Sequence, residues 1–110
     1  MRYKKKVGSH GEAFAASLLI DMGYEILERN YYTRLGEIDI IAKRDNVIHF
    51  VEVKTRTQIE YGYPAESVTN DKLNRMRKAA EIYMSNRRCR WNQASFDVVE
   101  VMTNMIMDCV

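Results

Sequence analysis

The feature that most constrains the fold is a pair of alternating stretches separated by the turn dipeptide Asp45-Asn46. Residues 37–44 and 47–56 both alternate between two kinds of side chain, which is the period of a strand with two different faces. Asp and Asn tolerate the positive backbone φ that a tight turn between strands requires. The two stretches are therefore predicted to pair as an antiparallel hairpin.

In a hairpin with a two-residue loop, Asp39 lies directly opposite Glu52, and Glu37 lies opposite Lys54. Opposite side chains have Cβ atoms about 4.5–5.5 Å apart, and two like charges at that separation destabilise a sheet. A hard divalent cation, Mg²⁺ or Mn²⁺, offsets such repulsion when carboxylate oxygens bind it. We therefore expect Asp39 and Glu52, with a backbone carbonyl near Val53, to form a metal site. A three- or five-residue loop would instead put the two carboxylates on opposite faces.

Two carboxylates, a metal ion and a lysine in one place suit the hydrolysis of phosphodiester bonds. The metal activates water and offsets charge on the phosphate, while Lys54 holds the water or stabilises the transition state. Glu37 serves either as a further ligand or as the partner of Lys54. The competing interpretation is a salt-bridged, exposed sheet face, because roughly one Glu-x-Lys triplet is expected by chance in this composition. An aspartate thirteen residues before Glu52 favours the metal site.

Two amphipathic helices are predicted from the spacing of apolar side chains. The first covers residues 11–22 with Ser9 as its N-cap, and its buried stripe is formed by Phe14, Ala15, Leu18, Leu19 and Met22. Thr69 opens the second helix, whose apolar stripe is formed by Leu73, Met76, Ala80, Tyr83 and Met84. The other face of the second helix is basic.

Two further strands, over residues 24–33 and 96–102, complete the set of elements. The order is then α-β-β-β-α-β, which predicts an α/β fold with a mixed sheet flanked by helices. The length of 110 residues suits a single domain, 1–110. Its parts are a basic N-terminal arm, the core and an apolar tail, over residues 1–7, about 8–103 and 104–110.

Composition excludes several classes of protein. Lys and Arg number 17 against 15 Asp and Glu, and the net charge of +2 rules out a histone-like polycation. No apolar run is long enough to span a membrane and no secretory signal is present, so we expect no membrane partner. Cys89 and Cys109 lack the spacing of a zinc site or a disulfide framework, which indicates a reduced, cytoplasmic setting.

The stretch GEIDIIAKRDNVIHFVEVKTRT resembles the Asp…Glu-x-Lys core of the restriction-endonuclease-like nucleases, which include archaeal Holliday-junction resolvases. With the further elements GEAFAASLLIDMGYEILERNYYTRL, YGYPAESVTNDKLNRM and AAEIYM, the chain is similar over about residues 8–103 to the YraN-type family of small bacterial proteins. The resemblance implies a restriction-endonuclease-like fold and Mg²⁺-dependent cleavage of DNA. One departure is that Ile38-Asp39 replaces the superfamily's Pro-Asp dipeptide, as is common in resolvase-like members.

The resemblance also implies roles for individual residues. The superfamily's metal ligands fall on Asp39 and Glu52, and its lysine falls on Lys54. A glutamate of the first helix, which often joins the site, falls on Glu12. A capping box with Ser9 explains Glu12 equally well, so both interpretations stay open.

Basic side chains near the site are expected to bind DNA phosphates, the usual source of affinity in such proteins. They are Lys72 and Arg75 at the start of the second helix, Arg56 after the hairpin, and Arg34. Arg34 follows Tyr31 and Tyr32, which suit stacking on the unpaired bases of branched or single-stranded DNA. The alternatives are solvated charges and tyrosines that pack on the core.

Three functions therefore remain open from the sequence. The first is an Mg²⁺-dependent endonuclease that hydrolyses DNA. The second is a nucleic-acid-binding module of the same fold with little or no catalysis, although clustered acids repel phosphate. The third is an assembly partner or a homodimer that docks through the apolar tail over 104–110.

Overall fold

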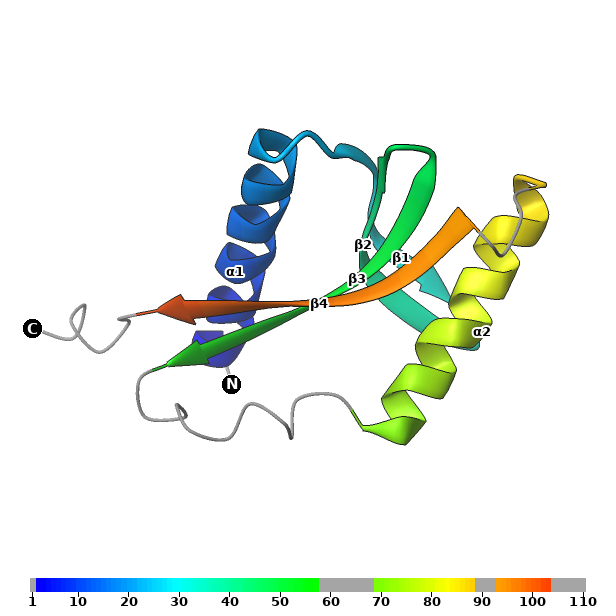
Figure 1. Ribbon diagram of the computed structural model, residues 1–110. Helices are drawn as coiled ribbons and strands as arrows, with labels where there is room; N and C mark the ends of the chain where they lie inside the picture. The colour runs from blue at the N-terminus through cyan, green and yellow to red at the C-terminus, as the bar shows by residue number, and fades with distance from the viewer. Residues whose placement is uncertain (1, 58–68, 89–92, 104–110) are drawn as a thin grey trace, which may run out of the picture.

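The computed structural model describes residues 2–57, 69–88 and 93–103, whose arrangement is shown in Figure 1. The elements are α1 (Arg2–Asp21), β1 (Glu25–Thr33), β2 (Gly36–Arg44), β3 (Val47–Thr57), α2 (Asn70–Asn86) and β4 (Ala94–Thr103). The predicted order α-β-β-β-α-β and the α/β fold class are confirmed. Both cysteines and the apolar tail over 104–110 lie outside the described residues.

The four strands form one mixed sheet in the order β1-β2-β3-β4, with α1 on one face and α2 on the other (Figure 1). β1 and β3 both run antiparallel to β2, whereas β4 runs parallel to β3. A parallel neighbour cannot be reached by a tight turn, so the chain crosses over through α2 before it enters β4. The hairpin strands β2 and β3 therefore lie at the centre of the sheet, between the two helices.

The hairpin between β2 and β3 has the predicted two-residue loop. Asp45 and Asn46 have φ angles of 53° and 65°, in the left-handed region that Asp and Asn tolerate. The pair next to the loop joins Arg44 to Val47, which is the expected register. The local turn chemistry therefore fixes which side chains of β2 and β3 share a face.

Each face of the sheet has its own hydrophobic cluster. The cluster under α1 contains Ala15, Ala16, Leu19, Ile40, Ala42, Val51, Val53 and Val101. The cluster under α2 contains Ile38, Ile41, Ile48, Phe50, Ala79, Ala80, Tyr83 and Met84. Successive side chains of a strand point to opposite faces, so Phe50, Glu52 and Lys54 share the face covered by α2.

The start of α1 differs from the prediction. The helix begins at Arg2, so residues 2–7 are part of it rather than a separate arm, and Ser9 is not its N-cap. Although α1 has 20 residues, neither helix in the described part of the chain is both long and apolar enough to cross a membrane.

The buried stripe of α1 also differs from the prediction. Phe14, Leu18 and Met22 are 60%, 41% and 52% exposed. Ala15 and Leu19 are buried as predicted, and Ala16 is buried with them. A Cβ on Gly11 would lie only 1.9 Å from Thr55 Oγ1, so the helix approaches the sheet along its smallest residues. Close packing at this glycine, rather than the size of the apolar side chains, decides which face is buried.

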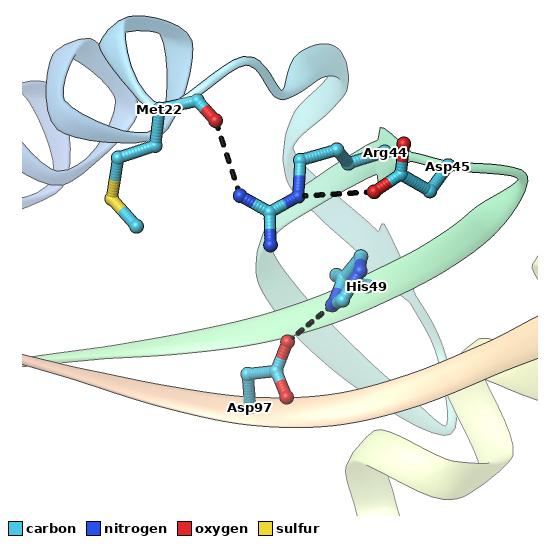
Figure 2. A network of polar contacts seen from close by, with 5 residues as sticks. All are labelled: Met22, Arg44, Asp45, His49 and Asp97. Carbon is cyan, nitrogen blue, oxygen red and sulfur yellow. Dashed lines mark hydrogen bonds and ion pairs between the residues drawn. The ribbon is translucent and has the colours of Figure 1, made fainter.

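Polar contacts near the hairpin loop join β3 to β4, and β2 to the residue that follows α1 (Figure 2). His49 Nδ1 on β3 lies 2.5 Å from Asp97 Oδ2 on β4. Ser95 Oγ, also on β4, donates to the other oxygen of Asp97 at 2.8 Å. Arg44 on β2 donates to the carbonyl of Met22, just after α1, at 3.1 Å. These contacts fix β4 to β3 and the hairpin to the end of α1, and they use none of the residues predicted for the metal site.

Candidate functional site

The strands β2 and β3 part at the position of the carboxylates. Among the described residues, the last backbone pair joins Ile40 to Val51, directly next to Asp39 and Glu52. From there β3 continues beside β4, while β2 stays paired with β1. The predicted direct opposition of Asp39 to Glu52, and of Glu37 to Lys54, is therefore wrong, although the register that leads to it is correct.

The Asp39 side chain lies between the parted strands. Its Oδ2 accepts a hydrogen bond from the backbone N–H of Val53 at 2.8 Å. The bond satisfies a backbone donor that has no pairing partner on β2 at this point. It also holds the carboxylate against the Val53 peptide, close to where the sequence predicts a metal-binding carbonyl.

The parted strands and the first half of α2 line a pocket of about 260 Å³. The sheet contributes Glu37, Asp39 and Glu52, and the helix side contributes Thr69, Asp71, Lys72, Arg75 and Met76. Three carboxylates of the sheet thus converge on one cavity, as the hairpin predicts for Asp39 and Glu52. Two cations on the helix side face them.

The close approach of α2 depends on Gly36, the first residue of β2. A Cβ at this position would lie 2.2 Å from the carbonyl oxygen of Arg75, so any other residue would push the helix backbone away. Thr69 caps the helix, and its Oγ1 accepts a hydrogen bond from the Lys72 N–H at 3.1 Å. Together the glycine and the cap place Lys72 and Arg75 over the carboxylates.

Glu52 is a buried carboxylate, with only 3% of its surface exposed. Its Oε2 forms an ion pair with Lys72 Nζ. Burial raises the pKa of Glu52 above its ordinary value; the Lys72 ion pair lowers that pKa, and the charge of Asp39 raises it again. Because the pKa stays raised, Lys72 does not fully compensate for burial and for the second carboxylate.

Glu12 of α1 belongs to the same acidic group. Burial is the main cause of its raised pKa, the charge of Asp39 adds to the effect, and Arg29 acts in the opposite direction. Since α1 begins well before Ser9, a capping box no longer accounts for this glutamate. The charge of Asp39 acts on Glu12, although Glu12 is not among the residues that line the pocket.

The oxygen atoms that line the pocket suit a hard divalent cation, but they are not arranged as a complete set of metal ligands. In the described ranges, no three Asp, Glu, His or Cys side chains form a metal-binding group. The existing pairs explain this, because Asp39 is bonded to Val53 and Glu52 is paired with Lys72. Carboxylate and carbonyl oxygens are the ligands of Mg²⁺ and Mn²⁺, so Asp39, Glu52 and the Val53 backbone are the groups that would hold one.

Lys54 lies two residues after Glu52 on the same face of β3. It is half-buried, and it makes no ion pair with any residue that the structure describes. Its side chain is not part of the pocket lining. The structure thus brings Asp39, Glu52 and Glu37 together and leaves Lys54 beside them.

Two of the four basic residues predicted to contact DNA are engaged in ion pairs within the protein. Arg56 is 7% exposed, and its Nε lies 3.2 Å from Glu100 Oε1 on β4. Lys72 is paired with Glu52, whereas Arg75 and Arg34 have exposed side chains. A phosphate contact by Arg56 or Lys72 would therefore compete with an ion pair within the protein.

Sequence reasoning placed Lys72 and Arg75 near the site, but it missed Thr69, Asp71 and Met76, which line the same side of the pocket. It also missed the contact of Lys72 with Glu52, because the sequence assigns this lysine to phosphate. The capping residue Thr69 does signal where the helix begins. The strand that this end of the helix faces depends on the crossover between β3 and β4, which no local pattern encodes.

Comparison with known proteins places this chain among similar sequences over most of its length. A model described as "Uncharacterised protein family UPF0102" matches residues 11–101. Proteins named "UPF0102 protein" from Dictyoglomus turgidum and Caldicellulosiruptor saccharolyticus are 44% and 45% identical, over 89% and 93% of this chain and 83% and 86% of their own length. A third, from Acetivibrio thermocellus, is 48% identical over 89% of this chain and 76% of its own. The matched region includes every residue of the pocket.

Proposed function

The chain belongs to the uncharacterised protein family UPF0102, and we propose that this protein is a metal-dependent nuclease that hydrolyses DNA. The observation that carries the proposal is the pocket at the parted strands, where acidic side chains of the sheet face Lys72 and Arg75 of α2. Carboxylates that hold a divalent cation, beside cations that bind phosphate, are the combination that phosphodiester hydrolysis requires. The resemblance to Asp…Glu-x-Lys nucleases supports the same reaction.

Each residue has a distinct role in this proposal. Asp39 and Glu52 hold Mg²⁺ or Mn²⁺, and Glu12 and Glu37 strengthen the negative potential that attracts the cation. The cation offsets the charge of the phosphate and lowers the pKa of the attacking water. Lys54 orients that water or stabilises the charge that develops on the phosphate in the transition state.

Branched or single-stranded DNA is the proposed substrate because of the turn between β1 and β2. Tyr32 is 78% exposed there, and Arg34 is exposed two residues later. An exposed aromatic ring beside a cation suits stacking on unpaired bases. The same turn leads directly into Glu37 and the pocket, so a stacked base would lie near the carboxylates.

The test is a cleavage assay with labelled single-stranded, duplex, flap and four-way-junction DNA in Mg²⁺ and in Mn²⁺. Lys54→Ala and Glu52→Gln should each slow cleavage by about a hundredfold or more, the scale of losing one electrostatic contribution to the transition state. In Ca²⁺ gel shifts, Lys54→Ala should bind DNA as the wild type does, because other basic residues supply ground-state affinity. Lys43→Ala, an exposed lysine of β2 outside the pocket, is the matched control.

Two results would replace this proposal. Tight DNA binding without cleavage of any substrate in either metal would identify a binding module with a nuclease-like pocket. Absence of both binding and cleavage would favour a role in a larger assembly.

The assembly role has its own supporting observation, a set of exposed apolar side chains. Phe14 and Leu18 on α1 and Met22 directly after it recur at helical spacing, and the edge strand β4 exposes Val98 and Met102. Sedimentation velocity at increasing concentration should then show a homodimer that Leu18→Ser dissociates. A monomer at every concentration would exclude self-association through the exposed side of α1.

A further inference from the structure

The ion pair between Lys72 and Glu52 joins two groups of very different exposure. The Glu52 side chain is 4% exposed, whereas the Lys72 side chain is 41% exposed. Lys72 lies in the first turn of α2, where Thr69 caps the helix, and its ammonium reaches from there to the sheet. One end of the pair is therefore fixed in the protein interior, and the other is tethered at the rim of the pocket.

A buried carboxylate beside a second carboxylate is unfavourable unless a cation neutralises it. Two cations line the pocket, Lys72 and Arg75. Among the described residues, Lys72 is the one whose charge contacts Glu52, and Asp39 contributes the neighbouring negative charge. Lys72 thus supplies the counter-charge that a divalent cation would otherwise supply.

We propose that Lys72 is a built-in counter-cation of Glu52 that a divalent metal must displace when it binds the pocket. This inference rests on the proposed metal site at Asp39 and Glu52. A divalent cation and the Lys72 ammonium repel each other when both lie against the Glu52 carboxylate, so each weakens the binding of the other. The two cations therefore compete for Glu52, and the intact pair weakens metal binding.

Displacement also changes where the Lys72 charge lies. Because the side chain stays tethered to the first turn of α2, the released ammonium remains at the rim, next to Arg75. A phosphate that approaches the metal would meet two cations there rather than one. Metal loading thereby prepares the pocket for an anionic substrate, and by linkage a bound phosphate favours the metal.

The test is a titration of the full chain with Mn²⁺ at pH 8, in which the electron paramagnetic resonance signal reports the free ion. Lys72→Met should tighten Mn²⁺ binding by about tenfold, because the metal no longer displaces a charged hydrogen bond. Arg75→Met removes the same charge from the same pocket without breaking the pair, so it should tighten binding by less. Lys72→Arg keeps the charge and should leave the affinity near that of the wild type.

The controls separate this inference from the metal site on which it rests. Asp39→Asn should weaken Mn²⁺ binding, and an unchanged affinity in that variant would overturn both the site and the inference. If Asp39→Asn weakens binding but Lys72→Met does not tighten it more than Arg75→Met does, the site stands and the counter-cation role is wrong. If Lys72→Met does not fold, Lys72→Arg decides, since tenfold tighter binding with the charge retained would contradict competition.

Discussion

At the scale of single residues, the stability of the pocket depends on which of its carboxyl groups are ionised. Glu52 and Glu12 both have raised pKa values, and burial is the main cause in each case. Burial penalises the charged form of a carboxyl group, and the charge of Asp39 adds to the penalty for both. Ionisation of these groups therefore costs stability in the metal-free protein.

This cost predicts a pH dependence of stability in the presence of a chelator. Because the folded state binds the Glu52 proton more tightly than the unfolded chain, its contribution is fully present below the ordinary pKa of 4.5 and is lost as the pH rises through the raised pKa. The free energy of unfolding of the wild type, relative to that of Glu52→Gln, should therefore fall in urea titrations as the pH rises above 4.5. Glu81→Gln, on the exposed face of α2, controls for the substitution itself. If the free energy of unfolding of the wild type, relative to that of Glu52→Gln, rises with pH, the raised pKa is contradicted.

At the scale of helices and strands, two glycines set the distance between the helices and the sheet. Gly11 brings α1 onto Thr55, and Gly36 brings α2 onto the sheet at Arg75. Each glycine directly precedes an acidic residue of the site, Glu12 or Glu37. The close packing that these glycines allow therefore also positions the acidic group.

Gly36→Ala tests this link between packing and the pocket. The added Cβ would meet the Arg75 carbonyl oxygen, and overpacking of this kind typically costs about 1–3 kcal/mol. We expect lower stability in urea titrations together with weaker Mn²⁺ binding, since α2 must move away from the carboxylates. Gly23→Ala is the control. Gly23 has a φ of 93°, which alanine adopts only at a cost, so this substitution should lower stability at a position far from the pocket. Wild-type stability of Gly36→Ala would show that α2 does not pack as described.

What the sequence predicts correctly at this scale is what local chemistry decides. The turn dipeptide and the two-residue alternation fix the hairpin register, and Thr69 marks the start of α2. The sequence predicts only part of the buried face of α1, Ala15 and Leu19, because the contact at Gly11 involves a distant strand. It also misses the partner of Lys72, because the crossover through α2 decides which carboxylate the lysine meets.

For the whole molecule, the arrangement of charge matters more than its sum. The net charge is only +2, yet acidic side chains gather at the parted strands while cations lie at the start of α2 and at the β1–β2 turn. A phosphate backbone is repelled by the first group and attracted by the second. We therefore expect DNA to be held by the rim of the pocket.

The salt dependence of DNA binding tests this arrangement. Replacing both Arg34 and Arg75 with Ala should lower the slope of log affinity against log salt, by roughly 0.9 for each duplex phosphate that the protein no longer neutralises. All sequences should be weakened alike, since Arg at the rim meets phosphates rather than base edges. Lys43→Ala should leave the slope unchanged. A weakening confined to particular sequences would indicate base readout instead.

The central claim is that Asp39 and Glu52 hold a divalent cation, and the most direct measurement is anomalous X-ray diffraction from crystals soaked in Mn²⁺. The account predicts an anomalous peak between the two carboxylates, next to the Val53 backbone, and a Lys72 side chain that has moved away from Glu52. It also predicts that the peak disappears in Asp39→Asn crystals. Saturating Mn²⁺ that leaves the pocket without a peak, with the Lys72–Glu52 ion pair intact, would contradict the claim.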